Sequence, residues 1–460
     1  MADKYTNDKV KYFAVLNLAA RLCALYVLCV LSACALPPGQ PPAPSTTVKL
    51  APPAGPCVVL GLPASGSYEA IAAKIRKGAE AARQEMIEQG ASVRLEIINT
   101  EGAHWLAELS ALPAECAVVG SPLQAVRYEE ARRTGLTEQR VFFTFLPSLE
   151  AGDEGVRAWR FFPSPQDQID AIVAFATDSL NIRAYGAFYP NDAFGVRMTA
   201  LLEQSLAAKS MFLQKASYPP GDVTVWSDAA ASLVRPVPGP DGRTPIPQTP
   251  FEALFLPDSW KNMDLLITSL LYNGEDRLVL LGTTLWEQGL SGRILANVEK
   301  YSLAVFPGAW NAAAAPAVLK ARNGDFWMAL GYDFTRFAVK LGLYSRPAPR
   351  DVNAALREAR TTWSMAPIFW DDAGLAHQRL WMFQVSSLGM TPADPELFAQ
   401  IRAAVLQRAA LRMQGQPAVD AQGNPLVPLP PGQSFQGNQP ALPISSTPRP
   451  SYKLSLPQSR

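Results

Sequence analysis

The stretch CVVLGLPASGSYEAIAAKIRKGAEAARQEM, residues 57–86, decides the fold of this chain. It opens with a continuous apolar run at residues 57–62, which is typical of a strand buried on both faces of a parallel sheet. Residues 67–86 then repeat apolar side chains at helical spacing, and residues 93–97 alternate apolar and polar side chains. This order predicts a strand, a helix and a second strand, which together form a β–α–β unit with parallel strands.

The same alternation of strands and helices continues far beyond this unit. Further strands are predicted at residues 116–119, 141–145, 185–189, 212–217, 252–256, 278–281, 303–306 and 379–385. Further helices are predicted at residues 105–109, 124–133, 166–180, 194–208, 226–233, 260–271, 325–341 and 395–413. Residues 235–250 contain six prolines and two glycines and are predicted to form an exposed loop. The pattern predicts an α/β protein with mostly parallel sheets flanked by helices, built either as two hinged lobes or as one large doubly wound enzyme.

A stretch that ends at Cys34 has the pattern of an export signal. An apolar run, residues 22–33, follows a segment with several cationic side chains. The run has about 12 residues, whereas a membrane-spanning helix needs roughly 20, so it suits the apolar region of a secretory signal peptide. Its end, Leu-Ser-Ala-Cys, is similar to the lipobox of bacterial lipoproteins, whose cysteine is acylated and becomes the mature N-terminus. We expect a signal peptide at residues 1–33 and a lipid membrane anchor on Cys34, with a short buried helix and an incidental cysteine as the alternative.

Proline-rich segments flank the central part of the chain. Residues 35–56 contain eight prolines, and such chain favours extended polyproline II and forms no core. We interpret residues 34–56 as a tether that holds the folded part away from the membrane. Ala35 follows Cys34, which resembles the outer-membrane sorting signal of Gram-negative lipoproteins, so we expect the protein on the periplasmic side of a bacterial membrane, the outer one. Residues 414–460 are rich in Pro, Gln, Gly and Ser and are expected to be disordered.

The composition argues against several classes of function. Lys and Arg total 41 and Asp and Glu total 40, so there is no net positive field to attract nucleic acid. The two histidines, His104 and His377, are far apart, and no Cys or His pair has metal-ligand spacing, so no metal or other cofactor is expected. Gly-x-Ser-x-Gly, Walker A and Gly-x-Gly-x-x-Gly motifs are absent, so we expect no enzyme. We interpret His377 beside Asp371 and Asp372 as a surface turn rather than an acid–base site.

Two cysteines remain in the central part of the chain, because Cys23 and Cys29 leave with the expected signal peptide and Cys34 is expected to be lipidated. Cys57 and Cys116 each precede a short apolar run that is predicted to be a strand. If the two strands are neighbours, their spacing of about 4.8 Å is close to the Cα separation that a disulfide accepts. We predict a Cys57–Cys116 disulfide, formed in an oxidising compartment, with two buried free thiols as the alternative.

Short motifs follow one another in a characteristic order along the chain. They are VVLGLPASGSY (58–68), IRKGA (75–79), VVG with a following Pro (118–122), AFYPNDAFG (187–195), YPPG (218–221), LGTTLW (281–286) and GYD (331–333). In this order they resemble the type I periplasmic binding proteins of the leucine-binding type. The resemblance covers most of residues 57–385 and implies a two-lobed α/β fold, in which each lobe has a mostly parallel sheet flanked by helices.

The resemblance also implies a division of the chain into lobes. Three hinge crossings are expected near residues 160–163, 306–310 and 367–378. Lobe 1 is then expected at residues 57–160 and 311–367, lobe 2 at residues 161–310 with its final strand at 368–392, and a C-terminal helix at 393–413.

In this family the cleft between the lobes holds the ligand, and the loops after the strands supply hydroxyls and amides that bind a carboxylate. The ligand-binding positions that this implies are Ser65, Gly66, Ser67, Tyr68, Ser121, Gln124, Thr144, Ser148, Asn191, Asp192, Phe194 and Asp258. One loop departs from the family pattern, because Leu123, Gln124 and Ala125 stand where amino-acid binders usually carry Ser or Thr. Gln124 still offers an amide donor. For each Ser or Thr, a turn or helix-cap role is the alternative.

A subgroup of this superfamily, the lipoproteins called penicillin-binding-protein activators, resembles the chain more closely. The shared features are the lipid anchor, the Pro-rich connections and segments such as residues 218–221 and 254–258. These proteins bind a peptidoglycan synthase rather than a nutrient. We place first a solute-binding protein that takes a small polar, amino-acid-like ligand for an ABC transporter permease or for sensing, since this is the commoner use of the fold. The alternative is a penicillin-binding-protein activator.

Overall fold

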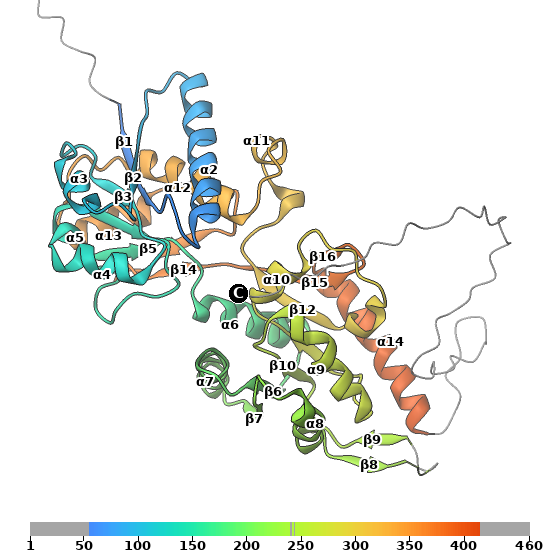
Figure 1. Cartoon of the computed structure of the whole chain (residues 1–460). Coiled ribbons are helices and arrows are strands. Elements are labelled where there is room, and N and C mark those ends of the chain that lie inside the picture. Colours follow the sequence, from blue (N-terminus) through green and yellow to red (C-terminus); the bar gives the residue numbers. More distant parts are fainter. Residues whose placement is uncertain (1–54, 240–241, 243, 415–460) are drawn as a thin grey trace, which may run out of the picture. The chain divides into compact units, whose positions relative to one another are not determined.

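The computed structural model describes residues 55–239, 242 and 244–414 (Figure 1). The expected signal peptide, Cys34, nearly all of the tether and nearly all of the Pro-rich tail lie outside these residues, so they remain predictions. Across the described ranges, no helix combines the length and the apolar character that a membrane span requires.

Five parallel strands form the first sheet, in the order β2-β1-β3-β4-β5. The strands are β1 (Cys57–Leu62), β2 (Arg94–Asn99), β3 (Val118–Gly120), β4 (Val141–Thr144) and β5 (Ala158–Arg160). The accompanying helices are α2 (Glu69–Glu88), α3 (Trp105–Ala111), α4 (Ala125–Arg133), α5 (Leu136–Gln139), η4 (Ala312–Ala314), α11 (Ala317–Lys320), α12 (Phe326–Leu341) and α13 (Pro349–Glu358). Val58 and Leu60 pack with α2 and α12, whereas Val59 packs with α3 and α4. The sheet is therefore buried on both faces, as the continuous apolar run of β1 predicts.

Seven strands form the second sheet, in the order β16-β15-β12-β11-β10-β6-β7. The strands are β6 (Ala184–Pro190), β7 (Phe212–Tyr218), β10 (Ala253–Phe255), β11 (Val279–Leu281), β12 (Ala304–Gly308), β15 (Trp381–Ser386) and β16 (Gly389–Pro392). The helices are α6 (Pro165–Ala174), η1 (Phe175–Ser179), α7 (Ala193–Ala207), η2 (Val223–Val225), α8 (Trp226–Val234), α9 (Trp260–Tyr272), α10 (Leu285–Leu290), η3 (Val298–Tyr301) and α14 (Pro395–Met413). Helices α8, α9 and α10 share one hydrophobic cluster, and α6, α7 and α14 share another. Only β15 and β16 run antiparallel to their neighbours within this sheet.

The chain passes between the two sheets three times. It leaves the first sheet after β5, and it leaves the second sheet after β12 to return through α11 and α12. The third passage runs through β13 (Ile368–Trp370) and β14 (Ala376–Gln378), an antiparallel pair that precedes β15. Two lobes and three crossings confirm the predicted architecture.

The structure differs from the sequence prediction mainly in short elements. Residues 235–250 are not simply a loop, since β8 (Pro236–Pro238) and β9 (Pro245–Pro247) form an antiparallel pair. This pairing is compatible with proline because Val237 faces Ile246 between the prolines, and these two residues keep their backbone N–H groups. Strands β5, β13 and β14 and helix α13 were not predicted. Three residues are too few to display a strand period, so pairing in three dimensions decides such strands.

Helices α2 and α12 approach each other closely at two glycines. A Cβ atom on Gly78 would lie 1.9 Å from the carbonyl oxygen of Met328, and one on Gly331 would lie 1.9 Å from the carbonyl oxygen of Ile75. Both distances are far below van der Waals contact, so the two backbones can touch only where no side chain intervenes. This contact attaches the chain that returns after the second crossing to the first sheet.

We expect Gly78→Ala to lower the free energy of unfolding by about 1–3 kcal/mol, because the new methyl group meets backbone atoms that cannot move aside. Helix propensity alone predicts the opposite sign, a gain of about 1 kcal/mol. Urea unfolding measures the difference, with Gly221→Ala as the matched control, since a Cβ atom there meets nothing within 4 Å. Equal midpoints for the two variants would contradict the close helix contact.

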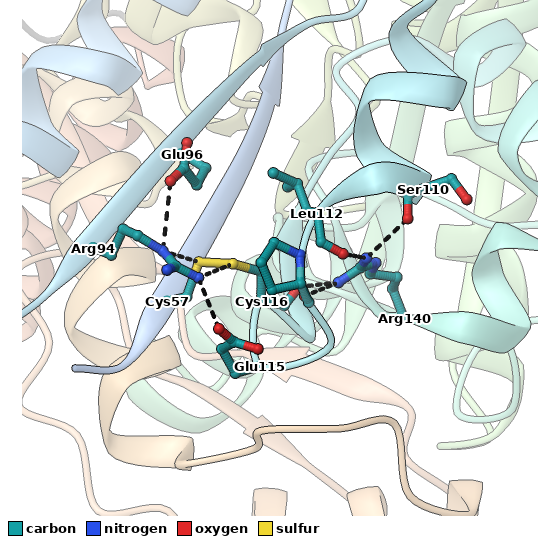
Figure 2. The surroundings of a disulfide bond; sticks show 9 residues. Cys57, Arg94, Glu96, Ser110, Leu112, Glu115, Cys116 and Arg140 are labelled. Atoms are coloured by element: carbon teal, nitrogen blue, oxygen red, sulfur yellow. Dashed lines mark hydrogen bonds and ion pairs between the residues drawn. A yellow bond between two sulfur atoms is a disulfide. The ribbon is translucent and has the colours of Figure 1, made fainter. Parts of the chain in front are cut away.

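The structure contains the predicted disulfide between Cys57 and Cys116 (Figure 2). Strands β1 and β3 are neighbours, and the Cα atoms of the two cysteines are 4.7 Å apart. The guanidinium of Arg94 lies over the bond, with Nε 3.3 Å from the Cys57 sulfur and Nη2 2.8 Å from the Cys116 sulfur. Arg140 donates to the carbonyl oxygens of Cys116 and Pro113 on the other side. The disulfide therefore joins two adjacent strands where the first sheet begins.

Replacing both cysteines, as in Cys57→Ala with Cys116→Ala, should lower the free energy of unfolding by about 4 kcal/mol, because a loop of this length restricts the unfolded chain. The bond spans a sequence separation of 59 residues. Urea unfolding with and without a reductant measures the effect. The reductant should lower the unfolding midpoint of the native protein but leave the midpoint of the double variant unchanged. If the reductant leaves the unfolding midpoint of the native protein unchanged, the disulfide does not stabilise the fold.

Candidate functional site

Most of the predicted ligand-binding residues lie in loops at the carboxyl ends of the parallel strands. Eight of them are exposed: Ser65, Gly66, Ser67, Tyr68, Ser148, Asn191, Asp192 and Phe194. Asp192 caps helix α7, since its carboxylate accepts from the backbone N–H of Gly195 at 2.7 Å. Gln124 is half-buried at the N-cap of α4, where its side chain makes no capping hydrogen bond. These residues are accessible at the strand ends, and their role in binding a ligand stays a prediction.

Two predicted hydroxyls are instead buried inside the first lobe. Ser121 and Thr144 both have 0% of their surface exposed, and neither hydroxyl oxygen has a hydrogen-bond partner among the residues that the structure describes. The Ser121 oxygen lies only 2.2 Å from the position that a Cβ atom on Gly61 would take, and the Thr100 methyl group is also beside that position. Ser121 therefore turns towards β1 and away from solvent. In this arrangement neither hydroxyl is accessible to a ligand.

The carboxylate of Asp258 is occupied by neighbouring donors in the second lobe. It accepts from the Tyr218 hydroxyl at 2.7 Å, from the Ser259 backbone N–H at 2.6 Å and from the Asn262 side-chain amide at 2.9 and 3.0 Å. Burial, together with the hydrogen bond to Asp258 and its charge, raises the pKa of Tyr218. A carboxylate with this many donors is a structural group, since each further ligand contact has to displace one of them.

Three sequence motifs meet around Asp258. The Trp286 indole N–H, from LGTTLW, donates to the Asp258 carbonyl oxygen at 3.0 Å, and Tyr218 comes from YPPG. The Trp226 indole N–H donates to the carbonyl oxygen of Pro219 at 2.9 Å, and its ring centroid is 4.8 Å from that of Tyr218. The motifs at residues 218–221, 254–258 and 281–286 therefore form one aromatic and hydrogen-bonded cluster that orders the strand ends of the second lobe.

A buried ion pair joins the first crossing to the third, and a backbone hydrogen bond joins the third to the second. Arg160, at the end of β5, pairs with Asp167 of α6 at 2.9 Å, and both side chains are almost fully buried. Arg160 also donates to the carbonyl oxygen of Ala376, and Asp167 accepts from the backbone N–H of Gln378 at 3.1 Å. The Ala366 N–H donates to the carbonyl oxygen of Ala309 at 2.8 Å, which links the second crossing to the third. Motion of one crossing relative to the others has to disturb this network.

Glu287, in the first turn of α10, is a candidate that the sequence analysis does not identify. Its side chain is half-buried. Its Oε2 lies 3.3 Å from the position that a Cβ atom on Gly308, at the end of β12, would take. Burial, and then the charge of Asp325, raise the pKa of Glu287 to about 7. Within the described ranges its carboxylate makes no hydrogen bond or ion pair, so it is available to a cationic group such as an ammonium. One glutamate in a six-residue helix has no spacing signal, so a sequence pattern does not reveal it.

Comparisons with known proteins identify the fold. No family model matches the chain, and no curated protein matches it either. A putative branched-chain amino acid ABC transporter protein from Rhodospirillum rubrum is similar over 74% of this chain and 100% of its own, with a TM-score of 0.56 and 12% identity. Full-length LpoA from Haemophilus influenzae is similar over 74% of this chain and 59% of its own, with a TM-score of 0.54 and 12% identity. The C-domain of that LpoA, described as a regulator of PBP1A, matches with a TM-score of 0.53, at 13% identity, over 74% of this chain and 100% of the domain.

The fold is that of a type I periplasmic binding protein. The resemblance inferred from the short motifs is therefore confirmed at the level of the fold. Sequence identities of 12–13% show the fold alone and do not show a shared function. The match also spans only 59% of full-length LpoA. The similar proteins are named as transport or regulatory proteins, and the same fold serves both.

If Asp258 organises the second lobe, Asp258→Ala should lower the free energy of unfolding by about 2–4 kcal/mol, because the hydroxyl of buried Tyr218 and the donors of half-buried Ser259 and Asn262 lose their acceptor. Asp228→Ala is the control, since Asp228 is an exposed acid on α8 of the same lobe and should change stability by less than about 1 kcal/mol. Chemical unfolding followed by tryptophan fluorescence reports on both variants. Similar losses for the two variants would show that Asp258 is not the centre of the cluster.

Proposed function

We propose that this protein is a non-enzymatic regulatory lipoprotein that binds a peptidoglycan synthase on the periplasmic side of a bacterial membrane. The observation that carries the proposal is the state of the strand-end loops. Ser121 and Thr144 are buried, and the carboxylate of Asp258 is engaged by its own neighbours. An amino-acid carrier needs accessible donors for the carboxylate of its ligand, whereas a protein partner needs only a well-ordered surface.

The network at the crossings supports the same proposal. A solute carrier of this fold works by closing its lobes over the ligand, which requires movement at the crossings. In this protein, such movement has to disturb the buried Arg160–Asp167 pair and its hydrogen bonds to the backbone of Ala376 and Gln378. Breaking a buried ion pair costs about 3–5 kcal/mol, a substantial fraction of the binding energy of a small ligand. A regulator that presents a fixed surface has no such cost.

The flanking segments fit a partner in the membrane. We propose that Cys34 is acylated and that residues 34–56 act as a stiff tether, as their proline content favours. The folded part then works at a distance from the bilayer, where it reaches a membrane-bound enzyme. LpoA, which has the same fold, is described as a regulator of PBP1A, and this likeness makes a synthase the first partner to test.

Amino-acid binding is the second candidate, and Glu287 is the observation that favours it. Its carboxylate has no partner within the described part of the chain and lies at the end of β12, so it is suited to an α-ammonium group. The exposed hydroxyls of Ser65 and Ser67 add possible donors for the ligand's carboxylate. The Rhodospirillum rubrum protein with this fold is named as a branched-chain amino acid transporter.

Crosslinking in cells that carry the full chain tests the first proposal. The expected result is covalent capture of a peptidoglycan synthase, and Cys34→Ala should reduce the capture because the protein is then no longer held at the membrane. Purified protein should in addition change the rate of glycan polymerisation or peptide crosslinking by the captured enzyme.

A thermal-shift screen of amino acids and short peptides tests the second candidate. A ligand present at 100 times its dissociation constant stabilises the native state by about 2.7 kcal/mol, which is an easily measured shift. Solute binding replaces the regulatory proposal if two results are found together. A ligand raises the melting temperature of the native protein but not of Glu287→Gln, and crosslinking in cells captures no synthase.

A further inference from the structure

A hollow of about 550 Å³ lies between α2 and α12 on the first lobe, away from the strand-end loops. The two helices touch at Gly78 and Gly331, and the hollow lies one turn farther along α2. Its lining residues are Lys77, Glu80, Ala81, Arg83, Gln84, Arg322 and Met328. Ala81 and Met328 are buried and form an apolar floor, while the remaining side chains supply a mostly cationic rim.

The cations of this rim differ from their neighbours in lacking counter-charges. Lys74 pairs with Asp325 at 2.6 Å, and Arg76 lies 3.6 Å from Glu80 on the same helix. In contrast, the side chains of Lys77 and Arg83 make no hydrogen bond or ion pair with any described residue. Two cations without partners beside a concave apolar floor are free to bind carboxylates, and they lose no existing contact when they do.

We propose that this hollow is the docking site for an acidic peptide segment of a protein partner. The apolar floor and the volume exceed what a single inorganic anion uses, and the carboxylate of Glu80 in the lining has Arg76 beside it at 3.6 Å. Lys77 and Arg83 are six residues apart, which is about 9 Å along the helix axis. Carboxylates on alternate residues of an extended peptide lie on one face of it, about 7 Å apart, so such a peptide can address both cations at once.

This proposal rests on the proposed regulatory function, because it takes the partner to be a protein. It commits to a surface outside the strand-end loops and to acidic chemistry on the partner, neither of which the regulatory function requires. The hollow is formed by elements of the first lobe alone, so its shape depends on the glycine contact of α2 with α12 and not on the crossings.

Fluorescence anisotropy with a labelled synthetic peptide of alternating Glu and Leu residues tests the site directly. The native protein should bind it, and binding should weaken as salt screens the charges. Lys77→Glu with Arg83→Glu should weaken binding at least tenfold. The matched control is Lys209→Glu with Lys261→Glu, which makes the same change in net charge at exposed cations of the second lobe and should leave binding unchanged. Urea unfolding confirms that both double variants are folded.

Three results would overturn the proposal: no binding to the native protein, equal loss in both double variants, or displacement of the peptide by equimolar inorganic phosphate. Crosslinking in cells separates this proposal from the regulatory function. If a synthase is captured equally by the native chain and by the Lys77→Glu, Arg83→Glu variant, the hollow is not the docking site and the regulatory function stands. If the peptide binds selectively but no synthase is captured, the hollow stands and the regulatory function fails.

Discussion

The buried pair of Arg160 with Asp167 is the interaction on which the two-lobed structure depends. It joins the end of the first sheet to the first helix of the second lobe, and its remaining hydrogen bonds reach the third crossing at Ala376 and Gln378. A charge buried this deeply is tolerated only when its partners are complete, so the crossings have one well-defined arrangement. The lobes of this protein are therefore connected by a specified joint rather than by three independent linkers.

Several polar groups at the strand ends are engaged by the packing of the protein itself. In the second lobe, the Tyr218 hydroxyl donates to the Asp258 carboxylate and the Trp286 indole N–H donates to the Asp258 carbonyl oxygen. In the first lobe, Ser121 is turned into the packed interior. These polar groups therefore stabilise the lobes of this protein themselves. We propose that a partner instead docks at another surface, the cationic hollow beside α2.

The sequence predicted the order of the long elements well because their periods are local. Helix α14 was predicted with the bounds it has, and the buried run of β1 identified a strand covered on both faces. The short strands β5, β13 and β14 and the β8–β9 pair were not predicted, since three residues are too few to show a strand period and only pairing with a neighbouring strand defines them. The predicted loop residues did fall at strand ends, but accessibility is set by packing around each side chain. Pattern alone therefore did not distinguish buried Ser121 from exposed Ser65.

The sequence by itself predicted the α/β class from its periodicity and the Cys57–Cys116 disulfide from the spacing of neighbouring parallel strands. The two-lobed fold followed from the ordered motifs that resemble the type I periplasmic binding proteins, because the alternation of strands and helices alone also allowed one large doubly wound sheet. Only the tertiary structure decided that the Asp258 carboxylate is occupied by its neighbours, that an ion pair links the first and third crossings, and that Lys77 and Arg83 have no counter-charge among the described residues. The physical reason is that hydrogen bonding, burial and charge pairing arise between residues far apart in the chain. They exist only once the helices and sheets have packed.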